Sequence, residues 1–202
     1  MSRLAADFYQ RTDVEQVAKE LLGTFLCTHF DDQLTIGKIV ETEAYRGPDD
    51  KACHAYNHRR TKRTEVMYWQ GGHAYVYLIY GIHHLFNVVT AGIDQAHAVL
   101  IRAVEPIEGI PTMLERRGQS QLLPKLTAGP GTLSKALGIS TLYTGQNMLL
   151  PDSPIWLEQG ESPIEEQDII ASPRVGIGYA EEWVEVPWRF RIRGSKWTSR
   201  AK

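Results

Sequence analysis

Two glutamates and a tyrosine alternate in "VETEAY", residues 40–45, a stretch that has the pattern of a strand end. Because successive strand side chains point to opposite faces, Glu41, Glu43 and Tyr45 share one face. Residues two apart on a strand have Cα atoms about 6.6–7 Å apart, near the carboxylate spacing of inverting glycosidases. Such a pair could stabilise an oxocarbenium-like state and deprotonate water. The alternative is two solvent-facing glutamates.

A single arginine, Arg102, interrupts the apolar run "HAVLIRAVEP", residues 97–106. Burying a charge without a partner is costly, so the sequence predicts that Arg102 pairs with a carboxylate. Glu41 and Glu43 are the candidates, either within a reactive cleft or in a purely structural ion pair.

Four tyrosines lie in or at the ends of apolar, strand-like segments and near the basic stretch "HRRTKR", residues 58–63. Flat rings beside cations suit stacking on nucleic acid bases. Packing of each ring in the core is the alternative. The four are Tyr45, Tyr75, Tyr77 and Tyr80.

His54 and His58 are four residues apart and follow Cys53, a spacing that could share a metal ion on a helix. No HExxH motif, second cysteine pair or acidic ligand at helical spacing accompanies them, so we expect no metal site. Cys27 and Cys53 form no CxxC motif, and the first ten residues have no apolar signal segment. We therefore expect reduced thiols in a cytoplasmic protein without a membrane span.

The 202 residues carry a net charge of −2 and have a pI of about 6.4, which excludes a bulk polycation. Cations gather at residues 58–63 and in the tail from Pro187 to Lys202, whereas acids gather between Glu158 and Asp168. This segregation predicts one side that faces a polyanion. Each patch alone is also typical of an ordinary solvated face.

Hydrophobic patterning predicts the elements that must position these residues. The predicted strands and helices do not follow a repeating βαβ order, and no glycine-rich nucleotide loop follows a strand. This favours an α+β fold with a largely antiparallel sheet. No shift in composition marks a boundary, so we expect a single domain over residues 1–202. Helices are predicted at 11–23, 110–118 and 131–138, and strands at 24–30, 34–45, 73–81, 85–90, 97–106, 154–158 and 189–194.

Several longer motifs follow one another in order: "GKIVETEAYRGPDDKACHAY", "TKRTEVMYW", "GHAYVYLIYG", "FNVV", "VLIRAVEP", "GPGTLSKALGI", "RVGIG" and "RFRIRGSKW". Through them, from about Leu21 to Trp197, the sequence resembles the alkyladenine / 3-methyladenine DNA glycosylase family. The resemblance implies a curved, partly open antiparallel β-barrel with flanking helices and a protruding β-hairpin. It also implies a monomeric, cofactor-free enzyme that binds double-stranded DNA through the minor groove.

The resemblance further implies the reaction. Such an enzyme flips alkylated or deaminated purines out of the duplex and hydrolyses the N-glycosidic bond, without lyase activity. Glu43 corresponds to the general base that deprotonates the attacking water. Arg102 and the backbone carbonyl of Val175 correspond to groups that hold this water.

The same resemblance assigns the base pocket. Tyr45 and His54 correspond to one wall of the pocket and Tyr77 to the other, and the His54 backbone amide corresponds to a donor to the base edge. Tyr80 corresponds to a wedge that fills the gap in the duplex, and Asn87 to a steric gate against the 2-amino group of guanine. Tyr77 and Tyr80 have opposite strand parity, so they can point in different directions.

Arg59, Thr61 and Arg63 correspond to contacts with the DNA backbone. The chain departs from the usual family pattern at rim positions, which bears on lesion preference and affinity. These departures are Lys62, His83, His84, Leu85, Phe86 and Thr132.

Two other functions fit parts of the pattern. A DNA-binding protein without catalysis would share the scaffold but would not need Glu43. A nucleoside hydrolase would use Glu41 and Glu43 together and would act on free nucleosides.

Overall fold

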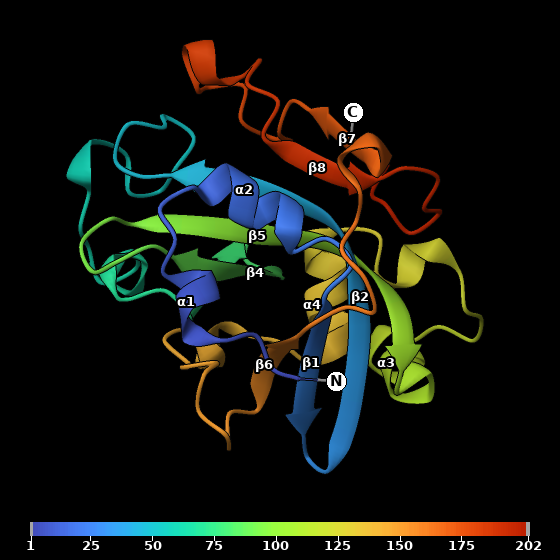
Figure 1. Ribbon diagram of the computed structural model, residues 1–202. Helices are drawn as coiled ribbons and strands as arrows, with labels where there is room; N and C mark the ends of the chain where they lie inside the picture. The colour runs from blue at the N-terminus through green and yellow to red at the C-terminus, as the bar shows by residue number, and fades with distance from the viewer. Residues whose placement is uncertain (1, 201–202) are drawn as a thin grey trace.

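The computed structural model describes residues 2–200, in which eight strands form one sheet with four α-helices around it (Figure 1). The strands are β1 (Phe25–Phe30), β2 (Gln33–Arg46), β3 (Ala74–Ile79), β4 (His83–Thr90), β5 (His97–Glu108), β6 (Ile155–Glu158), β7 (Ile169–Ser172) and β8 (Arg189–Ile192). The helices are α1 (Ala6–Tyr9), α2 (Val14–Glu20), α3 (Ile110–Arg117) and α4 (Pro130–Leu137). Short 3₁₀ turns lie at Tyr56–His58, Glu65–Tyr68, Pro124–Leu126, Thr141–Tyr143, Glu166–Asp168 and Glu181–Trp183.

Every helix and strand predicted from the patterning is present, with ends that differ by a few residues. The sequence did not predict two elements of four residues, α1 and β7, although it predicted β6 and β8, which are equally short. Within the described residues, none of the helices combines the length and apolar character needed to cross a membrane.

The sheet is antiparallel and open, with the strand order β3-β4-β5-β2-β1-β6 along its main path. The long strand β2 has two successive neighbours on one edge: its first half pairs with β1, and residues 41–43 pair with β8. β8 in turn pairs with β7. The predicted α+β fold with a curved, partly open antiparallel sheet is therefore confirmed, and the fork in β2 brings the C-terminal strand beside the two glutamates.

The two faces of the sheet are covered differently. On one face, α2 packs on β2 and β5, and α4 packs on β4 and β5, which encloses the main hydrophobic core (Figure 1). In β5, Val99 and Ile101 belong to this core, whereas Leu100 and Arg102 line a cavity on the other face. That second face is covered by the segments 52–67 and 175–179 instead of helices.

Three register irregularities interrupt the pairing of β2 with β5, and two of them flank Glu41. These two leave Val40 in β2 and Arg102 in β5 without a residue directly opposite. Bulges of this kind bend strands and change the direction of side chains, and they recur next to active sites. Here the irregularity directs the Arg102 guanidinium toward the glutamates of the neighbouring strand.

The β3–β4 hairpin ends in a tight turn in which Tyr80 (φ 52°) and Gly81 (φ 71°) are both left-handed. The backbone N–H of Ile82 donates to the carbonyl of Ile79 at 3.2 Å, which closes the turn. Turns with positive φ at both central positions match the twist of hairpin strands. A tyrosine is an uncommon residue at such a position, and its ring is 86% exposed.

Candidate active site

A cavity of about 390 Å³ lies on the face of the sheet opposite the main core. Its volume falls within the range of small-molecule sites, roughly 300–1,000 Å³. Three of the eleven predicted site residues, Glu43, Arg59 and Thr61, do not line the cavity. Glu43 nevertheless contacts three residues that do line it. The other eight line the cavity: Tyr45, His54, Arg63, Tyr77, Tyr80, Asn87, Arg102 and Val175.

Glu43 is completely buried, and both of its carboxylate oxygens are held. Oε1 accepts a hydrogen bond from the backbone N–H of Val175 at 2.8 Å and lies 3.2 Å from Nη1 of Arg102. Oε2 accepts a hydrogen bond from the Tyr45 hydroxyl at 2.8 Å. Since Glu41 is also 0% exposed, the alternative of two solvent-facing glutamates is wrong.

Arg102 pairs with both candidate carboxylates, because its Nε lies 3.0 Å from Oε1 of Glu41 while Nη1 reaches Glu43. Glu41 has further donors in Arg189 and Ser199. Burial alone would raise the pKa of Glu41, but Arg102 and these donors hold that pKa below its usual range. Glu41 is therefore an ionised carboxylate saturated by partners, and the two glutamates are not chemically equivalent.

Tyr45 has a cation behind its ring. The guanidinium carbon of Arg174 lies 4.7 Å from the centroid of that ring. Arg174 donates to both carboxylate oxygens of buried Asp50, at 2.5 and 2.9 Å, and to the backbone carbonyl of Ala44 at 2.8 Å. Because Arg174 precedes Val175 in the chain, this bidentate pair also fixes the peptide that binds Glu43.

The His54 and Tyr77 rings lie 4.6 Å apart at an angle of 76°, and Tyr75 stands behind both. Nδ1 of His54 shares a hydrogen bond of 2.8 Å with the Tyr75 hydroxyl. Burial, with smaller contributions from the cations of Arg63 and Arg59, lowers the pKa of His54 to about 4. His54 is therefore uncharged at neutral pH, so this part of the cavity does not repel a cationic ligand.

Asn87 and Tyr80 occupy opposite ends of the hairpin strands. Asn87 is buried, and its Nδ2 donates to the backbone carbonyls of Tyr75 (3.1 Å) and Leu85 (3.3 Å). With Nδ2 held in this way, Oδ1 is the polar atom of Asn87 that remains for the cavity. Tyr80 lines the outer end of the same cavity but projects into solvent from the turn.

The cations of the basic stretch, residues 58–63, differ in whether they form internal ion pairs. Arg59, Lys62 and Arg63 are exposed, and the Arg63 guanidinium lies 5.2 Å from the Tyr77 ring centroid. Arg60 instead forms ion pairs with Glu65 (2.8 Å) and Asp94 (2.7 Å). The exposed cations can reach an external polyanion without breaking an internal ion pair.

Thr61 is exposed and also holds the turn after the basic stretch. Its backbone N–H donates to Oγ1 of Thr64 at 2.9 Å, and its Oγ1 accepts from the Thr64 backbone N–H at 3.3 Å. A structural role for Thr61 therefore stands beside the predicted one.

The basic tail is not one surface patch, although its charge pattern suggested one. Arg189 is buried and bonded to Glu41, and Arg191 is half-buried with a hydrogen bond to Ser172. Arg193 is exposed. Lys202 lies outside the described residues.

Sequence reasoning missed Arg174, Asp50 and Tyr179. Tyr179 is 66% exposed, lines the cavity, and its hydroxyl donates to the carbonyl of Ala52 at 3.4 Å. The available signal was closeness in the chain, since Arg174 is the first residue of the motif "RVGIG" that contains Val175, and Tyr179 directly follows it. Their partners are more than a hundred residues away in the chain, which spacing alone does not reveal.

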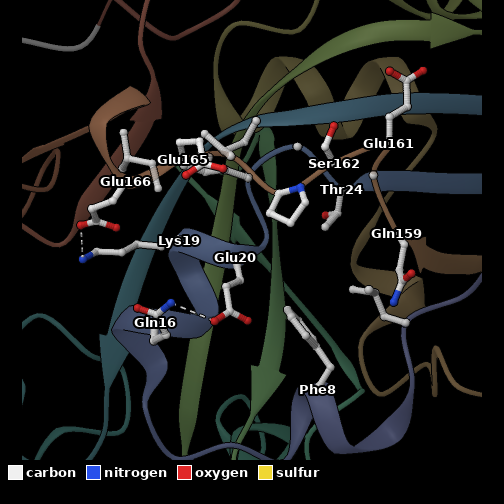
Figure 2. A pocket seen from close by; sticks show the side chains of 17 residues that line it. Phe8, Gln16, Lys19, Glu20, Thr24, Gln159, Glu161, Ser162, Glu165 and Glu166 are labelled. Carbon is white, nitrogen blue, oxygen red and sulfur yellow. Dashed lines mark hydrogen bonds and ion pairs between the residues drawn. The ribbon is translucent and has the colours of Figure 1, made fainter.

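A larger cavity, of about 720 Å³, lies between α2 and the segment 159–166 (Figure 2). None of the predicted site residues lines it. Its lining includes Glu20, Glu161, Glu165 and Glu166, with Lys19 paired to Glu166 at 3.0 Å (Figure 2). This acidic lining repels a phosphate backbone, so size does not make it the better candidate.

Among residues 2–200, no group of three histidine, cysteine, aspartate or glutamate side chains is arranged so that it could hold a metal ion. Cys27 and Cys53 are both buried free thiols. Burial raises the pKa of each thiol to about 12, which keeps both protonated.

Comparisons with known proteins agree with this geometry. A family model described as methylpurine-DNA glycosylase matches residues 7–196. A Chlamydia abortus protein is 49% identical over 191 residues, covering 94% of this chain and 97% of the relative. A Natranaerobius thermophilus protein is 46% identical over 198 residues, covering 98% of each chain. Both relatives carry the name "Putative 3-methyladenine DNA glycosylase".

Proposed function

Since the chain belongs to the methylpurine-DNA glycosylase family and is a DNA repair glycosylase, we propose that it hydrolyses the N-glycosidic bond of alkylated or deaminated purines in duplex DNA. The substrate class comprises 3-methyladenine, 7-methylguanine, hypoxanthine and ethenoadenine. The observation that carries the proposal is the buried Glu43 carboxylate, held by Val175, Tyr45 and Arg102 at the back of an aromatic cavity.

In the proposed reaction, Glu43 takes a proton from a water molecule whose oxygen attacks C1′ of the flipped nucleotide. The C1′–N bond breaks, and its electron pair leaves with the base. Arg102 and the carbonyl oxygen of Val175 are proposed to orient this water, because Arg102 lies 3.2 Å from the Glu43 carboxylate and the Val175 backbone N–H donates to the same carboxylate. A cationic alkylpurine leaves as a neutral base, whereas hypoxanthine also needs a proton.

The cavity can recognise an extruded base by stacking. The rings of Tyr45, His54 and Tyr77 supply aromatic walls, and an uncharged His54 accommodates a cationic purine. Tyr80, at the exposed tip of the hairpin, is placed to fill the gap in the duplex, as wedge residues of minor-groove proteins do. Asn87 is held rigidly enough to act as a steric gate.

The exposed cations Arg59 and Arg63, with Thr61, are proposed to contact phosphates beside the minor groove. Among the described residues, no lysine lines the cavity, which agrees with a monofunctional hydrolase that forms no Schiff base. We propose a monomeric cytoplasmic enzyme that needs no cofactor.

The use of two carboxylates by a nucleoside hydrolase is less compatible with the site. Glu41 accepts hydrogen bonds from Arg102, Arg189 and Ser199. A carboxylate offers about four acceptor positions, and Glu41 already accepts four hydrogen bonds, so it has less capacity for a substrate water than Glu43. Glu43 alone is placed for proton transfer.

The test is base release from duplexes that carry each of the four lesions. Glu43→Gln is expected to abolish release and to retain binding to a lesion duplex. Glu105 is a half-buried glutamate in β5. The Glu105→Gln variant is the matched control and should keep full activity. Turnover by Glu43→Gln would refute the general-base role, and release from free nucleosides would favour the nucleoside hydrolase.

A further inference from the structure

The guanidinium of Arg102 has a different partner at each of its three nitrogens. Nε donates to Glu41 at 3.0 Å, Nη1 faces Glu43 at 3.2 Å, and Nη2 donates to the Ser199 hydroxyl at 3.5 Å. A planar guanidinium is fixed in orientation by contacts of this kind. Only one of the three partners belongs to the proposed reaction.

Glu41 connects Arg102 to the C-terminal segment. Its Oε1 accepts from Arg189 Nε at 2.7 Å and from the Ser199 hydroxyl at 2.8 Å, and its Oε2 accepts from the Ser199 backbone N–H at 2.5 Å. Arg189 also donates to the Ser199 carbonyl at 3.2 Å. The side chain of Trp197, two residues earlier, is buried in the main core and anchors the segment there.

The buried charges around Arg102 are balanced, and this balance determines where its guanidinium lies. Two carboxylates, Glu41 and Glu43, face two guanidiniums, Arg102 and Arg189, in a buried space. If Glu41 were neutral, Arg102 would be drawn toward Glu43, the only remaining carboxylate partner that it has among the described residues. It would then cover the oxygen that must receive the proton.

We propose that Glu41 and Ser199 are positioning residues, and that the docked C-terminal segment completes the active site by holding Arg102 in the orientation that leaves Glu43 free to activate water. This inference rests on the proposed hydrolase function. It assigns the segment around Ser199 a role in the chemical step rather than in DNA binding.

The experiment measures single-turnover base release and lesion-duplex affinity separately, for the full-length chain. Glu41→Gln keeps the shape of the side chain and removes its charge, and should slow release about 10- to 100-fold, the scale expected for a misplaced catalytic group. Ser199→Ala removes one hydroxyl and should slow release roughly 2- to 10-fold. Both should change lesion affinity by less than about twofold, because neither contacts the aromatic walls of the cavity, Tyr80 or the exposed cations.

Thr198→Ala is the matched control. Its hydroxyl donates to the Ser195 carbonyl at 3.3 Å within the same segment and makes no contact with Glu41. Should Glu41→Gln fail to fold, Ser199→Ala against Thr198→Ala still decides the question. Equal single-turnover rates for these two variants would overturn the proposal.

A double-mutant cycle separates positioning from general destabilisation. If Ser199 acts through Arg102, the Ser199→Ala substitution should have no further effect on single-turnover release in an Arg102→Met background. Additive losses would overturn the proposal. Wild-type protein that releases no alkylpurine would instead contradict the proposed function, so the two failures are distinguishable.

Discussion

The uncharged state of His54 should make the stability of this protein depend on pH in a defined interval. The pKa of the His54 imidazole is about 4 in the folded protein and close to 6.5 in an unfolded chain. Between these values the unfolded state binds a proton that the folded state does not. Stability is therefore fully present above about pH 6.5 and falls as the pH decreases toward 4.

The magnitude follows from this interval. Each pH unit within it is worth about 1.4 kcal/mol for one proton, so the loss is about 2 kcal/mol at pH 5 and about 3 kcal/mol at pH 4. His54→Asn removes the titrating ring and keeps a polar group near the Tyr75 hydroxyl. The variant should lack this part of the pH dependence.

The assay is urea unfolding of both proteins from pH 8 to pH 4.5. At pH 8 the difference in unfolding free energy gives the cost of the substitution itself. His97, whose pKa is also lowered by burial, is present in both proteins, so its contribution cancels in the difference. Free-energy curves that stay parallel down to pH 4.5 would refute the claim that His54 is held neutral.

Three further predictions concern DNA. Tyr80→Ser should weaken lesion-duplex binding about tenfold in anisotropy titrations and undamaged-duplex binding less; equal losses would contradict a wedge. Asn87→Ser should raise release of undamaged guanine, with thermal unfolding as the check on folding, and an unchanged background would argue against a gate. Arg59→Ala should reduce the slope of log affinity against log salt by about 0.9, whereas Arg60→Ala, which loses the ion pairs to Glu65 and Asp94, should leave that slope unchanged.

The sequence predicted elements that local patterning encodes. The predicted strands at 24–30 and 34–45 leave only a short connection, and the turn between β1 and β2 falls there, at Asp31 and Asp32, both with positive φ, as short polar residues allow. The strand β5 was predicted from its apolar run, and Arg102 was expected to find a carboxylate because burial demands one. These features depend on neighbours in the chain or on a single physical requirement.

Features that depend on register could not be predicted. Strand parity places Glu41 and Glu43 on one face, but it does not reveal that bulges on both sides of Glu41 aim Arg102 between them. Arg189 appeared to be part of a basic surface, because its charge is visible in the sequence and its burial is not. The burial follows from the pairing of β8 with the second half of β2.

The distinction between the two glutamates therefore comes from tertiary pairing, not from their spacing. A buried carboxylate is tolerated only with compensating partners, and the partners of Glu41 lie 61, 148 and 158 residues away in the chain. Glu43 receives weaker compensation, from one peptide N–H, one hydroxyl and the guanidinium that it shares with Glu41. An oxygen held in this way retains acceptor capacity, so the less saturated glutamate is the one able to take a proton from water.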